Sequence, residues 1–185
     1  LLAYIAAFAV MGIAGAGRLP STPSRNHVPQ YFVLLVAEWL MFFYAWRGLK
    51  STGTPLAAVI GERWRGLGGA LRSILTAAAF WAVAVAILGA AKRVLDATAP
   101  GQAAEANRTI ALMAPHGAIE IVLWIALALS AGFCEEFVFR GYLQRQLTAF
   151  TRSAPAGIAL SALCFGLGHG YQGPRSVAVI TLYGL

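Results

Sequence analysis

The sequence predicts an all-α protein, a polytopic bundle of transmembrane helices. Of its 185 residues, 59% are hydrophobic and only 11% are charged, and the mean hydropathy is +0.69. A soluble domain carries about 25% charged residues. The apolar residues also gather in runs that mostly approach the ~20 residues a spanning helix needs. We therefore expect an integral membrane protein.

Six apolar runs predict five helices and the start of a sixth. They are residues 1–17, 31–46, 73–91, 117–139, 155–170 and 176–185. The first run has no basic stretch before it, so we interpret it as a membrane span and not as a secretory signal. Because the chain begins with Leu1 and stops inside the last run, we expect it to be a fragment, with N-terminal membrane helices and connecting loops over residues 1–116.

The run 31–46 contains one acid, Glu38, for which a satisfied polar contact inside the bundle is favoured over a catalytic role. The connection that follows, from Arg47 to Arg72, is strongly basic. Within it, Leu56 to Ile60 and Trp64 fit either a short amphipathic stretch at the membrane interface or a solvated loop. Both interpretations stay open.

The net charge of +7 reflects 14 Lys and Arg against 7 Asp and Glu, and most of the basic residues fall between apolar runs. In a membrane protein this excess indicates topology and anionic lipid, not nucleic acid. The second and fourth connections carry five and three basic residues, and the first, third and fifth carry two, three and one. This bias favours a cytoplasmic side for the second and fourth connections.

The run 117–139 begins after Pro115, which places Glu120 in the first turn of its helix, where the helix dipole favours negative charge. His27 and His116 fall in connections and are interpreted as ordinary interface residues. The two cysteines, Cys134 and Cys164, lie in apolar stretches and do not indicate a disulfide framework.

The same run leads directly into a charged cluster of Glu135, Glu136 and Arg140. A charge near the centre of a bilayer costs about 2.5 to 3.5 kcal/mol, so three of them without a use or mutual pairing would be strongly disfavoured. We therefore interpret the cluster as a working site.

A helical hairpin is predicted to bring an imidazole to this cluster. The helix continues through Leu147, turns at residues 151–155 and returns over residues 156–170. Glu135 lies 17 residues before Arg152 and His169 lies 17 residues after it, so both should sit about 25 Å from the turn. A carboxylate and an imidazole at one depth can share a water molecule, the minimum arrangement for general-base hydrolysis.

Helical angles assign different roles to the two acids. Glu136 and Arg140 are neighbours at i,i+4, whereas Glu135 has no local partner and is our first choice for the base. Phe165 lies one turn before His169 and either walls the cavity or is simply a packed aromatic. A stripe of small residues on the return helix should allow another helix to approach closely. It consists of Gly157, Ser161, Cys164 and Gly168.

Two motifs resemble a known family. Glu-Glu-x-x-x-Arg at 135–140 and Phe-x-x-x-His at 165–169 resemble the first two motifs of the CPBP intramembrane proteases, which include the type II CAAX prenyl endopeptidases and bacterial Abi-type proteins. Residues 139–143 and 161–163 agree as well. The resemblance covers residues 117–185, which would form a partial catalytic core, and it implies a bundle of about eight membrane helices.

The resemblance also implies roles for the site residues. Glu135 would activate the attacking water with Glu136 assisting, and His169 would position the water or the oxyanion. Arg140 would support the acids. The family's third motif, His-x-x-x-Asn or Asp, does not occur between His169 and Leu185. Both zinc and a metal-independent glutamate mechanism stay open as cofactor hypotheses, although one site histidine cannot close a zinc site.

The expected function is an intramembrane endopeptidase that hydrolyses peptide bonds of membrane-associated substrates, as in CAAX processing. Its partners would be a peptide or protein substrate and the lipid bilayer, with no nucleic acid, and its location a multi-pass position in a bacterial cell membrane. One alternative is a non-proteolytic membrane scaffold or bacteriocin-immunity-type protein of the same family. Another is a proton- or ion-coupled transporter, although no inverted repeat is found in the chain.

Overall fold

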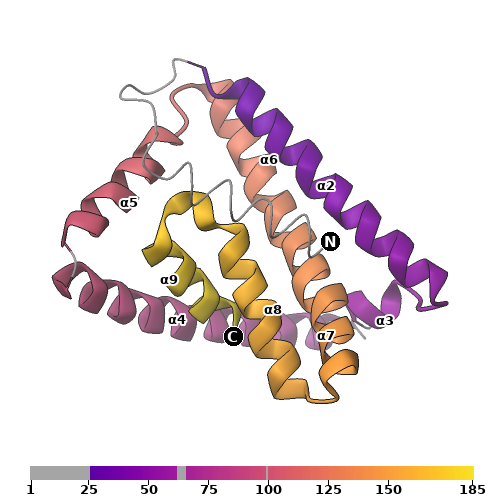
Figure 1. The fold of residues 1–185 in the computed structure, drawn as a ribbon. Coiled ribbons are helices and arrows are strands. Elements are labelled where there is room, and N and C mark those ends of the chain that lie inside the picture. The colour runs from indigo at the N-terminus through magenta and orange to yellow at the C-terminus, as the bar shows by residue number, and fades with distance from the viewer. Residues whose placement is uncertain (1–25, 62–65, 99) are drawn as a thin grey trace.

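The computed structural model describes residues 26–61, 66–98 and 100–185, and within these ranges it contains helices and no strand (Figure 1). The predicted all-α class is therefore confirmed. The predicted span 1–17 and the segment 62–65, which includes Trp64, lie outside the described residues.

The described helices follow one another with short connections. The elements are α2 (Val28–Ser51), α3 (Ala57–Ile60), α4 (Gly66–Thr98), α5 (Pro100–Leu112), α6 (Ala118–Glu135), the π-helix η1 (Glu136–Leu143), α7 (Gln144–Thr151), α8 (Ala154–Gly168), the 3₁₀ turn η2 (Gly170–Gln172) and α9 (Pro174–Gly184). Because α6, η1 and α7 succeed one another without a break, they form one continuous helical rod.

Three helical stretches in the described part of the chain are long and apolar enough to cross a membrane. They are α2, α4 and the rod 118–151, while α8 is apolar but shorter. Helix α2 contains the predicted run 31–46 and α4 contains the run 73–91, while the rod covers all of the run 117–139 except its first residue. The chain is thus that of an integral membrane protein.

Helix ends differ from the predicted ones where polar residues continue a helix. Arg47 and Lys50 lie on α2 and not in a connection, because Arg and Lys are good helix formers whose long side chains can reach water from a helix end. Helix α5 was not predicted, because its residues are too polar to form an apolar run. It starts with Pro100, a residue suited to the first helical turn.

Helices α2 and α6 lie side by side and run in the same direction (Figure 1). At their starts, Glu120 accepts hydrogen bonds from the backbone N–H groups of His27 and His116, both at 2.8 Å. Near the end of α2, Gly48 lies against the ring of Tyr142 of η1, where an added Cβ would come within 2.9 Å of the hydroxyl. Contacts at both ends therefore fix the register of the pair.

The expectation for His27 is wrong, since its side chain is only 2% exposed and is not an ordinary interface residue. Its ring stacks on Tyr31 and lies 5.6 Å from the ring of His116. Burial follows from the Glu120 bonds, which hold the start of α2 against the start of α6. Glu120 itself occupies the first turn of α6, as predicted.

The hydrophobic core is centred on η1, where the charged cluster begins. Its buried members are Phe42, Ala45, Leu49, Cys134, Phe137, Val138, Phe139, Leu143 and Phe165. Both cysteines are free, as expected. Since these side chains come from α2, the rod 118–151 and α8, the core fixes the three helices that carry the site.

The turn between α7 and α8 closes the predicted hairpin. Arg152 adopts a left-handed conformation with φ of 54°, and the Ser153 hydroxyl caps α8 by accepting from the Ala156 N–H at 3.4 Å. Further along α8, the buried Ser161 hydroxyl donates to the Phe139 carbonyl at 2.7 Å. The two arms are thus joined close to the charged cluster.

Replacing Ser161 with Ala should destabilise the protein by about 1 to 3 kcal/mol, because the Phe139 carbonyl would lose its donor in a buried place. Chemical denaturation of the full-length protein in detergent micelles measures this difference. The matched variant is Cys164→Ala, which removes a half-buried side chain from the same helix. Equal stabilities for Ser161→Ala and the wild type would show that this bond contributes nothing.

Helix α4 is joined to α9 by a charged contact near the C-terminal end of α4. Arg175, at the start of α9, pairs with Asp96 and donates to the Lys92 carbonyl at 3.1 Å. Asp96 also pairs with the Lys92 ammonium at 2.7 Å. Most other described side chains of α4 are exposed, as expected of a helix whose surroundings are lipid.

Candidate functional site

Glu135 and His169 meet across the hairpin. The Glu135 Oε1 atom lies 3.6 Å from the His169 Nε2 atom, and each side chain is 20% exposed. Glu135 is the last residue of α6, and His169 directly follows α8. The prediction that both residues lie at one depth on neighbouring arms is confirmed, whereas their chemical roles stay predictions.

The imidazole of His169 is held in one orientation by its own backbone. The return helix was predicted to run through Gly170, but α8 ends at Gly168, and His169 has φ of −97° and ψ of 15°. Its Nδ1 lies 2.9 Å from the Phe165 carbonyl, which can only accept, so Nδ1 carries the proton. When the ring is neutral, this tautomer presents the Nε2 lone pair to Glu135.

The separation of 3.6 Å between Glu135 and His169 is longer than a direct hydrogen bond. Both atoms are acceptors when the carboxyl is ionised and the imidazole is neutral. Two acceptors at this distance can be joined by one water molecule that donates to each of them. The geometry therefore suits a pair that orients a single water.

Two aromatic rings enclose the imidazole. The Phe165 ring lies edge-on at 4.9 Å between centroids, and the Tyr171 ring stacks at 6.2 Å. Of the two interpretations left open for Phe165, both are observed: its ring contacts the imidazole and is also part of the buried core. Tyr171 was not predicted, although an aromatic residue two positions after the site histidine was a visible signal. Together the rings restrict rotation of the His169 side chain.

The predicted pair of Glu136 and Arg140 is also present. The Arg140 Nη1 atom lies 2.8 Å from the Glu136 Oε1 atom. The Arg140 guanidinium also lies over the rings of Phe165, at 4.8 Å, and Tyr183, at 5.8 Å. Arg140 therefore connects Glu136 to the Phe165 ring that holds His169. The side chain of Glu136 is 56% exposed.

The acid cluster coincides with a change of helix type. Residues Glu136 to Leu143 form a π-helix, whereas the sequence predicted a regular α-helix over the same residues. The uniform 100° rotation behind the predicted angles therefore does not hold after Glu135. Arg140 still reaches Glu136, and short π-helical insertions occur frequently at functional sites.

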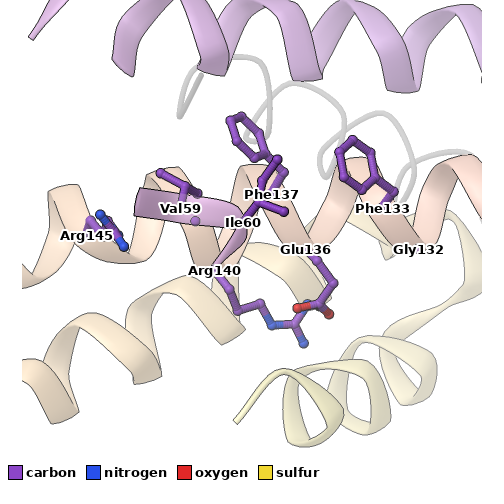
Figure 2. Close-up of a pocket in the computed structure, with 9 residues that line it drawn as sticks. Val59, Ile60, Gly132, Phe133, Glu136, Phe137, Arg140 and Arg145 are labelled. Carbon is purple, nitrogen blue, oxygen red and sulfur yellow. Dashed lines mark ion pairs between the residues drawn. The ribbon is translucent and has the colours of Figure 1, made fainter. Parts of the chain in front are cut away.

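A pocket of about 440 Å³ opens on the Glu136 side of η1 (Figure 2). Its walls come from α3, α6, η1 and α7, and its lining residues are Val59, Ile60, Gly132, Phe133, Glu136, Phe137, Arg140, Gly141 and Arg145. Figure 2 shows the rings of Phe133 and Phe137 on one side and the Glu136–Arg140 pair on the other. Neither Glu135 nor His169 lines this pocket, so it borders the candidate site without containing it.

Glu38 approaches the site from α2. Its Oε2 atom is buried and has no hydrogen-bond partner among the described residues, so the expectation of a satisfied polar contact is wrong. The carboxyl interacts electrostatically with Glu135, Cys134 and Tyr171 instead. Packing of α2 on α6 and η1 turns Glu38 toward these groups. A single acid within an apolar run was the signal for this residue.

The predicted stripe of small residues is only partly used. An added Cβ at Gly157 would lie 2.8 Å from the Thr148 backbone nitrogen, so α7 and α8 do approach closely there. At Gly168, no atom lies within 4 Å of an added Cβ. Helices α8 and α9 approach each other closely at Gly166 instead. The prediction fails at Gly168 because α8 ends there, beyond its contact with α9.

The described residues do not fit a zinc site. No group of three His, Cys, Asp or Glu side chains is placed to hold a metal ion within the described ranges. Zinc takes at least three protein ligands even in open catalytic sites. Glu135 and His169 supply two, while Glu136 is engaged with Arg140.

Residues 117–185 match the family model described as type II CAAX prenyl endopeptidase Rce1-like. Comparisons with curated proteins and with solved structures gave no match. Both motifs, at 135–140 and 165–169, lie in the matched residues. The predicted resemblance to the CPBP and CAAX proteases is therefore confirmed for this part of the chain.

Proposed function

We propose that the protein acts as a multi-pass intramembrane endopeptidase that hydrolyses peptide bonds of membrane-associated substrates. The observation that carries this proposal is the approach of Glu135 to His169 within 3.6 Å, in a hairpin that follows a membrane-spanning helix. The match of residues 117–185 to a protease family supports the same reaction. A bacterial cell membrane is the proposed location.

In the proposed reaction, Glu135 and the Nε2 atom of His169 orient one water molecule. The Glu135 carboxylate takes a proton from this water, and the water oxygen forms a bond to the carbonyl carbon of the substrate. The tetrahedral intermediate then breaks its C–N bond, and the leaving amine receives the proton held by Glu135. Every atom of the added water appears in the two products.

The other site residues hold this pair in place. Phe165 and Tyr171 restrict the imidazole, and the Phe165 carbonyl fixes its tautomer. Arg140 keeps Glu136 engaged and packs on the Phe165 ring. Because the described ligand set does not fit zinc, no step of the proposed reaction passes through a metal.

Replacing His169 with Ala should lower the cleavage rate about 100- to 10,000-fold, because water would lose one of the two groups that orient it. The measurement uses the full-length protein in lipid nanodiscs and a membrane-anchored peptide, with products identified by mass spectrometry. The control is Leu163→Ala, which changes an exposed side chain of α8, the helix that precedes His169. Wild-type cleavage by His169→Ala would remove the proposed mechanism.

The scaffold alternative predicts a different result from the same measurement. A protein that keeps the polar cluster for stability alone would release no peptide product in any form. Its His169→Ala variant would differ from the wild type only in melting temperature. Cleavage by the wild type that stops in the variant would decide for the endopeptidase.

A further inference from the structure

Glu38 is fixed in place by its neighbours on α2. The Trp39 indole donates to the Ser130 hydroxyl on α6 at 3.3 Å. One turn further, the Phe42 ring packs on Phe133 at 5.4 Å and on Phe137 at 4.7 Å. This face of α2 is therefore anchored along α6 and the start of η1 on the C-terminal side of Glu38, so the carboxyl position is set by packing.

One oxygen of the half-buried Glu38 side chain, Oε2, is an exception among buried polar atoms. Such groups almost always have a hydrogen-bond partner, and an exception calls for an explanation such as a functional role. The Oε2 atom is buried without a partner among the described residues. Because an unpaired buried carboxyl is costly, it would not persist here for stability alone.

The groups around Glu38 show which part of the molecule its carboxyl faces. The carboxyl interacts electrostatically with Glu135 from α6 and with Tyr171 from η2. Glu135 contacts His169, and the Tyr171 ring stacks on the same imidazole. Glu38 therefore belongs to the group of residues around His169, on the α2 side.

We propose that Glu38 is a third acid of the site and binds the peptide substrate by accepting a hydrogen bond from one of its backbone N–H groups. A peptide drawn into a membrane site brings N–H groups that lose their water partners, and each costs several kcal/mol if left unpaired. Glu135 and His169 are occupied with the water in the proposed function, on which this inference rests. Glu38 supplies a separate acceptor.

A purely structural role makes the opposite prediction for stability. If Glu38 were bonded within the protein, an apolar residue of similar size would leave its partner unsatisfied and destabilise the fold. If Glu38 is unpaired until substrate binds, Glu38→Leu should melt at or above the wild-type temperature while binding substrate less well. Loss of function with gain of stability is the pattern expected of a binding group.

The test uses the full-length protein in lipid nanodiscs with a membrane-anchored peptide, and compares Glu38→Leu with Glu38→Gln. For Glu38→Leu we expect kcat/KM to fall about 10- to 100-fold, mainly through KM, with no decrease in Tm. Glu38→Gln should recover part of this loss, because its amide oxygen still accepts a hydrogen bond. Leu40→Ala is the matched control on α2: it changes an exposed side chain near Glu38 and should keep wild-type kinetics.

Three results would overturn the inference, and they are distinguishable. Wild-type kcat/KM in Glu38→Leu would show that the substrate does not use the carboxyl, while the proposed endopeptidase would stand. A Tm well below that of the wild type would show that Glu38 has a partner within the protein, whether or not cleavage occurs. Absence of cleavage by the wild type itself would remove the proposed function and this inference with it.

Discussion

Replacing Glu135 with Gln should lower peptide cleavage about 100- to 10,000-fold. The amide has the same size as the carboxyl but cannot take a proton from water, so the variant removes the base and leaves the shape of the site. Glu135 is the carboxyl that contacts His169, at 3.6 Å, so its loss removes the proton acceptor from the proposed water position. The measurement is the single-turnover rate with a membrane-anchored peptide.

Two further variants separate this effect from general damage. Glu136→Gln should cost less, because Glu136 is paired with Arg140 and its side chain is 56% exposed. Leu129→Ala should leave the rate unchanged, because the Leu129 side chain on α6 is 72% exposed. If Glu135→Gln lowered the cleavage rate less than Glu136→Gln, the assignment of Glu135 as the base would be wrong.

The meeting of Glu135 with His169 could be predicted from the sequence because it depends on one short turn. Two helical arms that leave the same turn rise by similar distances per residue, so equal spacing from Arg152 gives about equal depth, although residues 136–143 of one arm are π-helical. The contact of Glu136 with Arg140 was predictable for a similar reason, since it joins neighbours within a single helix. Local spacing alone decides both contacts.

Glu38 and Tyr171 could not be assigned to the site in this way. Glu38 lies on α2, whose alignment with α6 is set by the Glu120 bonds at one end and by the fit of Tyr142 on Gly48 at the other. Those contacts join residues far apart in the chain, and spacing does not reveal them. Tyr171 depends on the end of α8 at Gly168, where the regular helix was expected to continue.

The π-helix over residues 136–143 could not be predicted from the sequence either. Its residues have no glycine or proline pattern that distinguishes it from an α-helix, apart from Gly141. Gly141 lies against the Val59 side chain of α3, so this side of η1 is closely packed. Tertiary contacts of this kind can override local preference, and they join residues too far apart in the chain for local spacing to reveal them.

Replacing Gly166 with Ala should destabilise the protein by about 1 to 3 kcal/mol, because α8 and α9 meet there without room for a side chain. An added Cβ would lie 2.7 Å from the Val177 carbonyl oxygen and 3.0 Å from the Thr181 backbone nitrogen. Both atoms belong to the backbone of α9, so the methyl group can be accommodated only if the whole helix shifts. Chemical denaturation of the full-length protein in detergent micelles measures this change in the free energy of unfolding.

The same helix provides a matched control in Gly168→Ala. No atom lies within 4 Å of a Cβ at Gly168, so this variant adds the same methyl group at the helix end without a clash. It should be neutral or slightly stabilising, because Ala loses less backbone freedom on folding than Gly. Equal destabilisation by both variants would mean that helix contact at Gly166 does not explain the loss.

A shift of α9 in Gly166→Ala should also disturb the candidate site. A packing defect without contact to the site would lower stability but leave the cleavage rate of the folded protein unchanged. Tyr183 of α9 lies 6.4 Å from the Phe165 ring and beneath the Arg140 guanidinium. Phe165 in turn holds the His169 imidazole, so displacement of α9 loosens the ring that orients it. Cleavage by Gly166→Ala should therefore fall even at temperatures where the variant remains folded, whereas a wild-type rate under those conditions would show that α9 does not support His169.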